Sequence, residues 1–128
     1  MIDIAERVEH LSAKGLCCAQ IVMAIGLEMR DESNDSLVRA MAGACNGLCS
    51  ESACGAFIAG ACLLSLFTDA DVSPLVRRLR KAFESEFSSI NCPDLVDLRQ
   101  RDYEKCREIT IRTCELCFEI LEDHDLFD

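Results

Sequence analysis

Several signatures of common enzyme classes are missing from this sequence of 128 residues. It contains no glycine-rich phosphate loop ending in Lys and Ser or Thr, and no HExxH zinc motif. Its 2 histidines, His10 and His124, stand alone in acidic, helical surroundings. The sequence therefore gives little support for a mixed Cys/His zinc site or for a Cys–His nucleophile pair.

Basic residues and long apolar runs are also scarce. The chain has 13 basic and 23 acidic residues, a formal net charge of −10, which repels phosphate backbones and argues against a nucleic-acid partner. The longest apolar run, 16–27, contains Gln20 and is shorter than the roughly 20 residues that span a bilayer. The acidic N-terminal residues show no signal-peptide pattern, so we expect a cytoplasmic protein without a membrane span.

Cysteine is abundant, with 10 residues. A chain of this length can bury a sufficient core without disulfides or metal. In a reducing cytoplasm, a cysteine-rich protein more often binds metal or performs redox chemistry than carries structural disulfides. The function is therefore expected to lie in the thiols.

Helical periodicity dominates the sequence, and no alternating strand pattern is longer than a few residues. Ser36 and the Ser73-Pro74 pair are typical of helix starts. We expect an all-α fold, a single antiparallel bundle of five to seven helices forming one domain over residues 1–128. The expected helices are 4–13, 17–29, 37–44, 53–67 and 74–87, a short one beginning at Pro93, and 102–122.

The segment around residues 45–61 is unusual. A cysteine-containing loop, 45–52, leads into a helix rich in small residues, among them Gly55, Ala56, Ala59 and Gly60. Side chains of this size cannot fill a core. They allow another helix or a bound group to approach the backbone closely.

Spacing along helices limits which thiols can share one site. Cys54 and Cys62 would lie about 12 Å apart along one helix, too far for one compact cluster. Cys106 and Cys117 face the same way but would lie about 16 Å apart. If Cys106 belongs to a site, Cys114 and Cys117 therefore belong to another site or to the core. These two cysteines form a CxxC, but it lies deep in a helix with no strand before it, unlike a thioredoxin site.

The remaining cysteines occur in local groups. The side chains of Cys17 and Cys18 diverge by about 100° on a helix, so at most one should point into a given site. One such group is a triplet that could bind a metal, formed by Cys45, Cys49 and Cys54. Its spacing matches neither ferredoxins nor zinc fingers.

Two cysteines are expected at helix N-termini. Cys92 precedes Pro93, and Cys54 falls near the start of the small-residue helix. Unpaired backbone N–H groups there favour negative charge, so we expect the pKa of both thiols to be lowered.

With these residues in view, the sequence resembles the family of redox-active proteins described by the cysteine pattern C_GCAxxG_C_C and common in anaerobic bacteria. Four segments in the family's order carry the resemblance and cover nearly the whole chain: Cys17-Cys18-Ala19-Gln20, Cys54-Gly55-Ala56, Cys92 with Leu95, and Cys106-Arg107-Glu108-Ile109. Ala59 stands where the family usually has glycine, with Gly60 beside it. Cys45 and Cys49 replace residues of a glycine-rich loop.

The resemblance implies a redox or metal-binding role, often beside membrane transport or anaerobic metabolism. Our leading hypothesis is that its four cysteines, Cys18, Cys54, Cys92 and Cys106, ligate an iron–sulfur cluster for electron transfer or redox sensing, with an unidentified partner protein. A homo-oligomer is compatible with this role. The further candidates for metal or redox chemistry are Cys45, Cys49, Cys17, Cys114 and Cys117.

Two alternatives remain open. In the first, a metal-free dithiol/disulfide oxidoreductase, Cys54 or Cys92 attacks and a neighbouring thiol resolves. In the second, the chain is a structural zinc-binding or plain helical interaction protein. Whether the protein is an enzyme depends on which of these holds.

Overall fold

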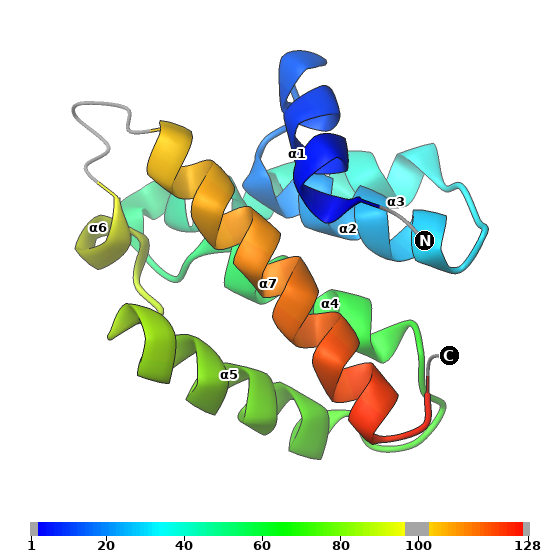
Figure 1. Cartoon of the computed structure of the whole chain (residues 1–128). Coiled ribbons are helices and arrows are strands. Elements are labelled where there is room, and N and C mark those ends of the chain that lie inside the picture. The colour runs from blue at the N-terminus through cyan, green and yellow to red at the C-terminus, as the bar shows by residue number, and fades with distance from the viewer. Residues whose placement is uncertain (1–2, 97–102, 127–128) are drawn as a thin grey trace.

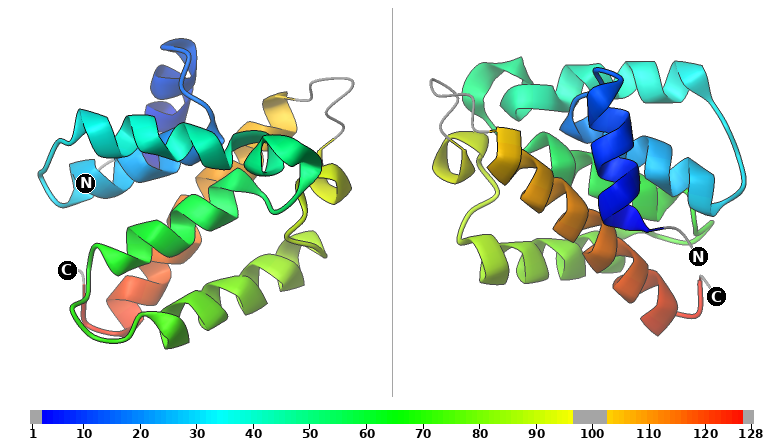
Figure 2. Two further views of the ribbon diagram at one scale, coloured as in Figure 1. Left: turned by 180° about the vertical axis from the view of Figure 1, so that it is seen from behind. Right: turned by 45° about the horizontal axis from the view of Figure 1, so that its top comes forward.

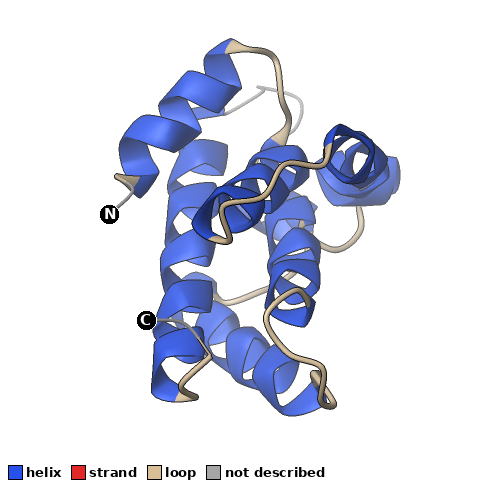
Figure 3. Cartoon of the chain, turned by 90° about the vertical axis from the view of Figure 1, so that its right-hand side faces the viewer, coloured by secondary structure: helices blue, strands red, loops and turns tan. Residues whose placement is uncertain are grey.

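All the regular secondary structure of the described residues, 3–96 and 103–126, is helical in a computed structural model of the chain (Figures 1 and 3). The expected all-α class is confirmed. Within those residues there are seven α-helices, with two short helical turns, η1 and η2, between α3 and α4. They run in the order α1 (Ile4–Ala13), α2 (Cys18–Met29), α3 (Asp35–Ala40), η1 (Met41–Ala44), η2 (Gly47–Glu51), α4 (Gly55–Ser65), α5 (Ser73–Phe87), α6 (Cys92–Leu95) and α7 (Tyr103–Asp123).

The long helix α7 organises the packing. It crosses the molecule diagonally in Figure 1 and contacts α1, α2, α4 and α5. Seen from behind in Figure 2, α4 lies beside α5, and α2 also packs on α4. Helices α2, α5 and α7 thus enclose the apolar helix α4.

Amphipathic spacing explains how α5 covers this core. Leu75, Leu79 and Phe83 recur every four residues and are buried. The Phe83 ring lies between those of Phe57 and Phe87, with centroid distances of 5.4 and 4.8 Å. The tilted rings join α4 to α5.

The small residues of α4 permit the close approach that the sequence predicts. A Cβ atom at Gly60 would lie 2.9 Å from Cγ2 of Thr113 and 3.2 Å from Sγ of Cys117, both on α7. It would also lie 3.1 Å from Cδ2 of Leu79 on α5. Gly60 therefore allows three helices to meet.

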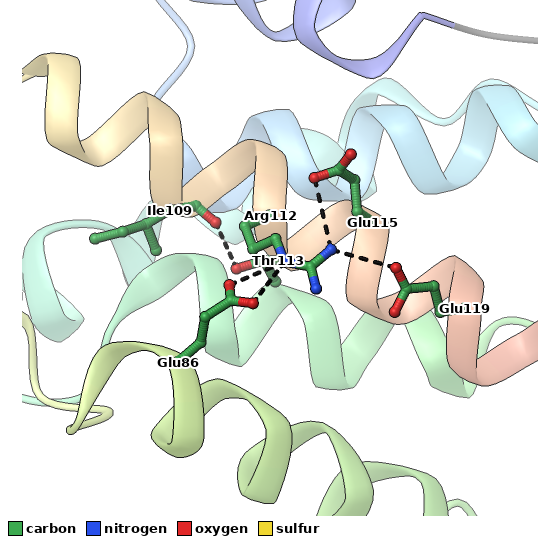
Figure 4. Close-up of polar contacts among 6 residues, drawn as sticks. All are labelled: Glu86, Ile109, Arg112, Thr113, Glu115 and Glu119. Carbon is green, nitrogen blue, oxygen red and sulfur yellow. Dashed lines mark hydrogen bonds and ion pairs between the residues drawn. The ribbon is translucent and has the colours of Figure 1, made fainter.

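On the outer surface, Arg112 fastens α7 to α5 (Figure 4). Its Nε donates hydrogen bonds to both carboxylate oxygens of Glu86, at 2.8 and 2.9 Å. Its Nη1 lies 3.3 Å from Glu119 and 3.8 Å from Glu115. Nearby, the buried Thr113 hydroxyl is satisfied by donating to the carbonyl of Ile109, at 2.7 Å.

The predicted helix boundaries need small corrections. The segment 37–44 is divided into α3 and the tighter turn η1, and the cap of α3 is Asn34 rather than Ser36, with its side chain accepting from Leu37 N–H at 3.0 Å. Asn34 is the N-cap instead of Ser36 because its amide oxygen reaches the free N–H groups of the first helical turn. Asp102, the predicted start of the last helix, lies outside the described residues.

Within the described part of the chain, no helix is both long enough and apolar enough to cross a membrane.

Candidate redox site

Four cysteines from four separate segments line one small cavity near the start of α7. They are Cys18, Cys54, Cys92 and Cys106, the four on which the family resemblance depends. Apolar side chains including Leu95, Val96 and Ile109 complete the wall. The structure therefore brings together the residues that the sequence singled out, while Cys62 on α4 is exposed and does not line the cavity.

A short antiparallel pairing of two loops brings Cys54 and Cys92 to the cavity. Ala53 and Asn91 form an isolated β-bridge, with hydrogen bonds from Cys54 N–H to the Ile90 carbonyl (2.6 Å) and from Cys92 N–H to the Ser52 carbonyl (2.8 Å). Cys54 is then the N-cap of α4, and Cys92 is the first residue of α6. Residues 38 positions apart in the sequence thus become neighbours.

Cys18 enters the cavity from the N-terminus of α2. Its sulfur accepts hydrogen bonds from the backbone N–H groups of Ala19 and Asn46. A Cβ atom at Gly55 would lie 3.0 Å from this sulfur and 2.5 Å from the carbonyl oxygen of Ala44. The glycine after Cys54 is therefore required by close approach, because any side chain there would displace Cys18 or the backbone at Ala44.

Cys106 contributes the fourth thiol from the first turns of α7, where it is half-buried. Cys106 and Cys18 are joined by a hydrogen bond between their thiols. Thr110, one turn further along α7, donates to the Cys106 carbonyl at 2.7 Å. The end of α7 beside α2 is thus tied into the site by a sulfur–sulfur contact.

The electrostatics of the cavity contradict the expectation of lowered pKa values. The pKa of Cys92 is raised to about 11 by burial, and then by its neighbours Cys54, Cys18 and Glu51. Burial also raises the pKa of Cys54, although the N–H groups of Phe57 and Ala56 act in the opposite direction. The helix N-termini are present as predicted, but desolvation outweighs them.

The pKa of Cys18 is raised as well, chiefly by its hydrogen bond with Cys106 and then by burial. Among the described residues, no cationic side chain lines this cavity. Among these residues, nothing offsets the raised pKa values of Cys18, Cys54 and Cys92, so these three thiols stay protonated at neutral pH unless a bound cation joins them.

The remaining cysteines lie elsewhere. Cys17 and Cys45 form a disulfide, with a Cα–Cα distance of 6.2 Å. Cys49 is exposed and does not line the cavity, so the loop 45–52 does not bring its thiols to the four-cysteine site. The Cys17–Cys45 bond also shows that the vicinal cysteines diverge as predicted, because only Cys18 faces the cavity.

The CxxC pair is part of the core. Cys114 and Cys117 are both fully buried in α7. Cys117 lies 3.6 Å from the Gly60 carbonyl, within reach of a weak thiol hydrogen bond. Burial raises the pKa of Cys114 to about 12 and raises that of Cys117 too.

The backbone beside the cavity is strained. Asn46, Leu48, Cys49 and Glu51 all have φ values near +60°, at 55°, 61°, 56° and 57°. Gly47, also with positive φ, leaves no room for a side chain because a Cβ atom would lie 2.5 Å from the Ser52 nitrogen. Strain of this kind is concentrated at functional sites, and here it directs the Asn46 N–H toward Cys18.

Sequence reasoning missed the contributions of the backbone. The Asn46 N–H, the Ala44 carbonyl and the pairing of residues 52–54 with 90–92 all shape the cavity. Of these, only the Asn46-Gly47 dipeptide carries a local signal, since such pairs often adopt positive φ. The loop pairing has no sequence signal.

The four thiols fit a soft metal chemically, since thiolates are the preferred ligands of zinc and of iron–sulfur clusters. In the described part of the chain, however, no group of three or more His, Cys, Asp or Glu residues is arranged to hold a metal ion. The free volume of the cavity is about 10 Å³, which is room for roughly one water molecule. Any bound group larger than a single ion requires the walls to move apart.

These features define an all-helical protein with a buried cluster of redox-capable thiols. The chain belongs to the family described as putative redox-active protein (C_GCAxxG_C_C), whose profile matches residues 16–120. No curated protein and no solved structure is significantly similar to it.

Proposed function

We propose that the cavity formed by Cys18, Cys54, Cys92 and Cys106 binds an iron–sulfur cluster and that the protein acts in electron transfer or redox sensing. The observation that supports this most strongly is the convergence of four thiols, from four segments, on one cavity. Nothing in the packing of helices requires four cysteines in one place. Four thiolates are also the usual protein ligands of such a cluster.

The electrostatics of the thiols favour a metal-bound site over a free nucleophile. An attacking thiol works best when its pKa lies near the ambient pH, whereas the pKa values of Cys18, Cys54 and Cys92 are all raised. A bound cation compensates for the burial and mutual repulsion of the thiolates. The group that best reconciles burial with thiolate chemistry is therefore a metal.

The surrounding residues suit this role. Backbone N–H groups point to the sulfur atoms of Cys18 and Cys54 and can stabilise their negative charge, as they do in many cluster sites. Leu95, Val96 and Ile109 limit the access of water. When bound, a cluster supplies one-electron chemistry, with a potential that depends on these hydrogen bonds and on burial.

Metal analysis of anaerobically purified and reconstituted protein tests the proposal. We expect iron and acid-labile sulfide to be present together, with visible absorbance. The matched pair of variants is Cys54→Ala and Cys117→Ala, since both cysteines are buried but only Cys54 lines the cavity. Iron should fall strongly in Cys54→Ala and stay unchanged in Cys117→Ala.

Other results would redirect the interpretation. Tightly bound zinc without sulfide or a redox response would support a structural metal site and contradict the cluster. Equal loss of iron in the two variants would mean that the effect comes from stability rather than ligation. Protein that binds no iron after reconstitution would also rule out the proposal.

The second candidate function is a metal-free dithiol/disulfide oxidoreductase, favoured by the hydrogen bond between the thiols of Cys18 and Cys106. These two sulfur atoms are already in contact, so oxidation to a disulfide needs little rearrangement. A reversible two-electron change confined to Cys18 and Cys106 in metal-free protein would establish it. Either function requires a partner that exchanges electrons, which we propose is another protein in the cytoplasm.

A further inference from the structure

We propose that the Cys17–Cys45 disulfide is a second redox site, which exchanges with low-molecular-weight thiols and disulfides through an open pocket beside the four-cysteine cavity. The proposal does not depend on whether that cavity binds a metal. It rests on the placement of the two sulfur atoms, on the pocket that reaches the sulfur of Cys17, and on the position of Cys17 at the N-terminus of α2.

The pocket has a volume of about 440 Å³ and reaches only one side of the disulfide. Cys17 is half-buried and lines the pocket, whereas Cys45 is 4% exposed and does not. Of the two disulfide sulfurs, a small thiol entering the pocket therefore meets only that of Cys17, and it also meets Cys18 and Cys106, which line the same pocket. The volume lies within the usual range for small-molecule sites, and is far too small for a folded partner.

The polar groups of the pocket suit a small polar thiol. Asn46, Thr110 and Arg107 line it together with the glycine at Gly15. Arg107 is exposed on α7 and forms no ion pair with another described residue. Its guanidinium can therefore meet the carboxylate of a thiol that carries one.

Local structure holds Cys17 in a fixed position at the start of α2. Cys17 is the N-cap of the 12-residue helix α2 and forms a capping box with Gln20. The Gln20 side chain accepts a hydrogen bond from Cys17 N–H at 3.1 Å, and the Gln20 backbone N–H faces the Cys17 side chain. This capping box fixes the Cys17 side chain at the start of α2, beside the pocket.

The exchange proceeds in two balanced steps. A small thiolate attacks the Cys17 sulfur, forming a mixed disulfide and breaking the bond to Cys45, whose thiolate takes up a proton. In the disulfide the Cys45 sulfur already lies 3.9 Å from the Met41 carbonyl oxygen, which can accept a weak hydrogen bond from the freed thiol. A second small thiolate attacks the external sulfur of the mixed disulfide and releases Cys17, so two thiols become one small disulfide and the protein gains two electrons and two protons.

Residue-resolved thiol trapping in glutathione redox buffers tests the proposal. The background carries Cys49→Ser and Cys62→Ser, which remove two exposed thiols outside both sites. In the folded protein we expect reversible opening of the Cys17–Cys45 bond, with glutathione found on Cys17 and not on Cys45. Circular dichroism at each buffer composition verifies that the protein stays folded.

A matched pair of variants separates reactivity from simple reduction. With Cys45→Ala, the free Cys17 should form a mixed disulfide with oxidised glutathione at least about tenfold faster than Cys45 does in the Cys17→Ala variant. Equal rates in the two folded variants would contradict the proposal. So would a wild-type disulfide that opens only after unfolding, since this is the behaviour of a purely structural bond.

Discussion

The cysteines of the cavity and those of the core have much in common, yet their surroundings differ in kind. Cys54 and Cys117 are both buried, and burial raises the pKa of each. Cys117 lies within a single helix and contacts a carbonyl, whereas Cys54 lies at a helix start with N–H groups directed at its sulfur. Burial alone therefore does not identify a functional cysteine. Convergence from several segments and the presence of backbone donors do.

The largest expected difference between the two regions is in metal-linked stability. A cluster that binds only the folded chain, at a hundred to a thousand times its dissociation constant, contributes about 3–4 kcal/mol. Chelation or exposure to oxygen should therefore bleach the visible absorbance and lower the melting temperature together. The Cys117→Ala variant should respond to chelation as the wild type does, whereas Cys54→Ala should begin with a low melting temperature that chelation barely changes. A melting temperature that does not respond to chelation in the wild type would contradict a metal role for the cavity.

A second prediction concerns the close packing at Gly55. A Cβ atom there would lie 2.5 Å from the Ala44 carbonyl oxygen and 3.0 Å from the Cys18 sulfur. We expect Gly55→Ala to lower the free energy of unfolding by about 2 kcal/mol and to reduce bound iron as well. Chemical denaturation and iron analysis measure the two effects.

The control for Gly55→Ala is Gly60→Ala, which crowds Thr113, Leu79 and Cys117 in the core. It should destabilise the protein by a similar amount without changing the iron content of the folded fraction. Loss of iron in both variants would mean that iron content reports stability, and that the separation between cavity and core is wrong.

A third prediction uses pH to separate the same two regions. In protein stripped of metal, the pKa of Cys92 is about 11, above its ordinary value of 9.0. Its contribution to stability is therefore complete below about pH 9 and is lost as the pH rises through 11. The shift corresponds to at most about 2.7 kcal/mol, and screening by solvent reduces the expected loss to about 1–2 kcal/mol, measured by urea unfolding at several pH values. Cys114, with a pKa of about 12, should add a further loss at higher pH.

Bound metal should reverse the direction of the pH dependence that Cys92 contributes to stability, and should leave the contribution of Cys114 unchanged. A ligating thiol is deprotonated in the folded state, so its folded pKa falls below the unfolded value and stability is lost on acidification instead. If the metal-loaded and stripped proteins show the same alkaline loss, Cys92 is not a ligand. A Cys92→Ala variant should lack that part of the alkaline loss in the stripped protein.

The helices could be predicted from the sequence because their signals are local. The spacing of Leu75, Leu79 and Phe83 fixes the buried face of α5, and Pro93 correctly predicts α6. The split between α3 and η1 was not predictable in the same way, since η1 packs against α2 and α4, which periodicity along the chain does not show. The residues whose placement is described begin α7 at Tyr103, close to the predicted start.

The membership of the site was predictable, but its electrostatics were not. Four short motifs named Cys18, Cys54, Cys92 and Cys106, and the structure places all four around one cavity. The expected lowering of the pKa at Cys54 and Cys92 was wrong. It took into account the helix N-terminus, which lowers a thiol pKa, but not burial, which raises it. Burial depends on segments far away in the sequence. The Cys17–Cys45 disulfide is likewise a tertiary contact, across 28 positions, that spacing could not reveal.

The smallest expected effect belongs to the core pair and is the strictest test of the comparison. Replacing Cys117 with alanine removes one buried sulfur and its contact with the Gly60 carbonyl at 3.6 Å. We expect a loss of about 1 kcal/mol in the free energy of unfolding, because alanine leaves a small cavity but no unpaired charge. Iron content, visible absorbance and the thiol reactivity of Cys17 should all stay at wild-type values. A change in any of these without a matching loss of stability would show that Cys117 takes part in the redox chemistry, and would assign the CxxC pair to function rather than to packing.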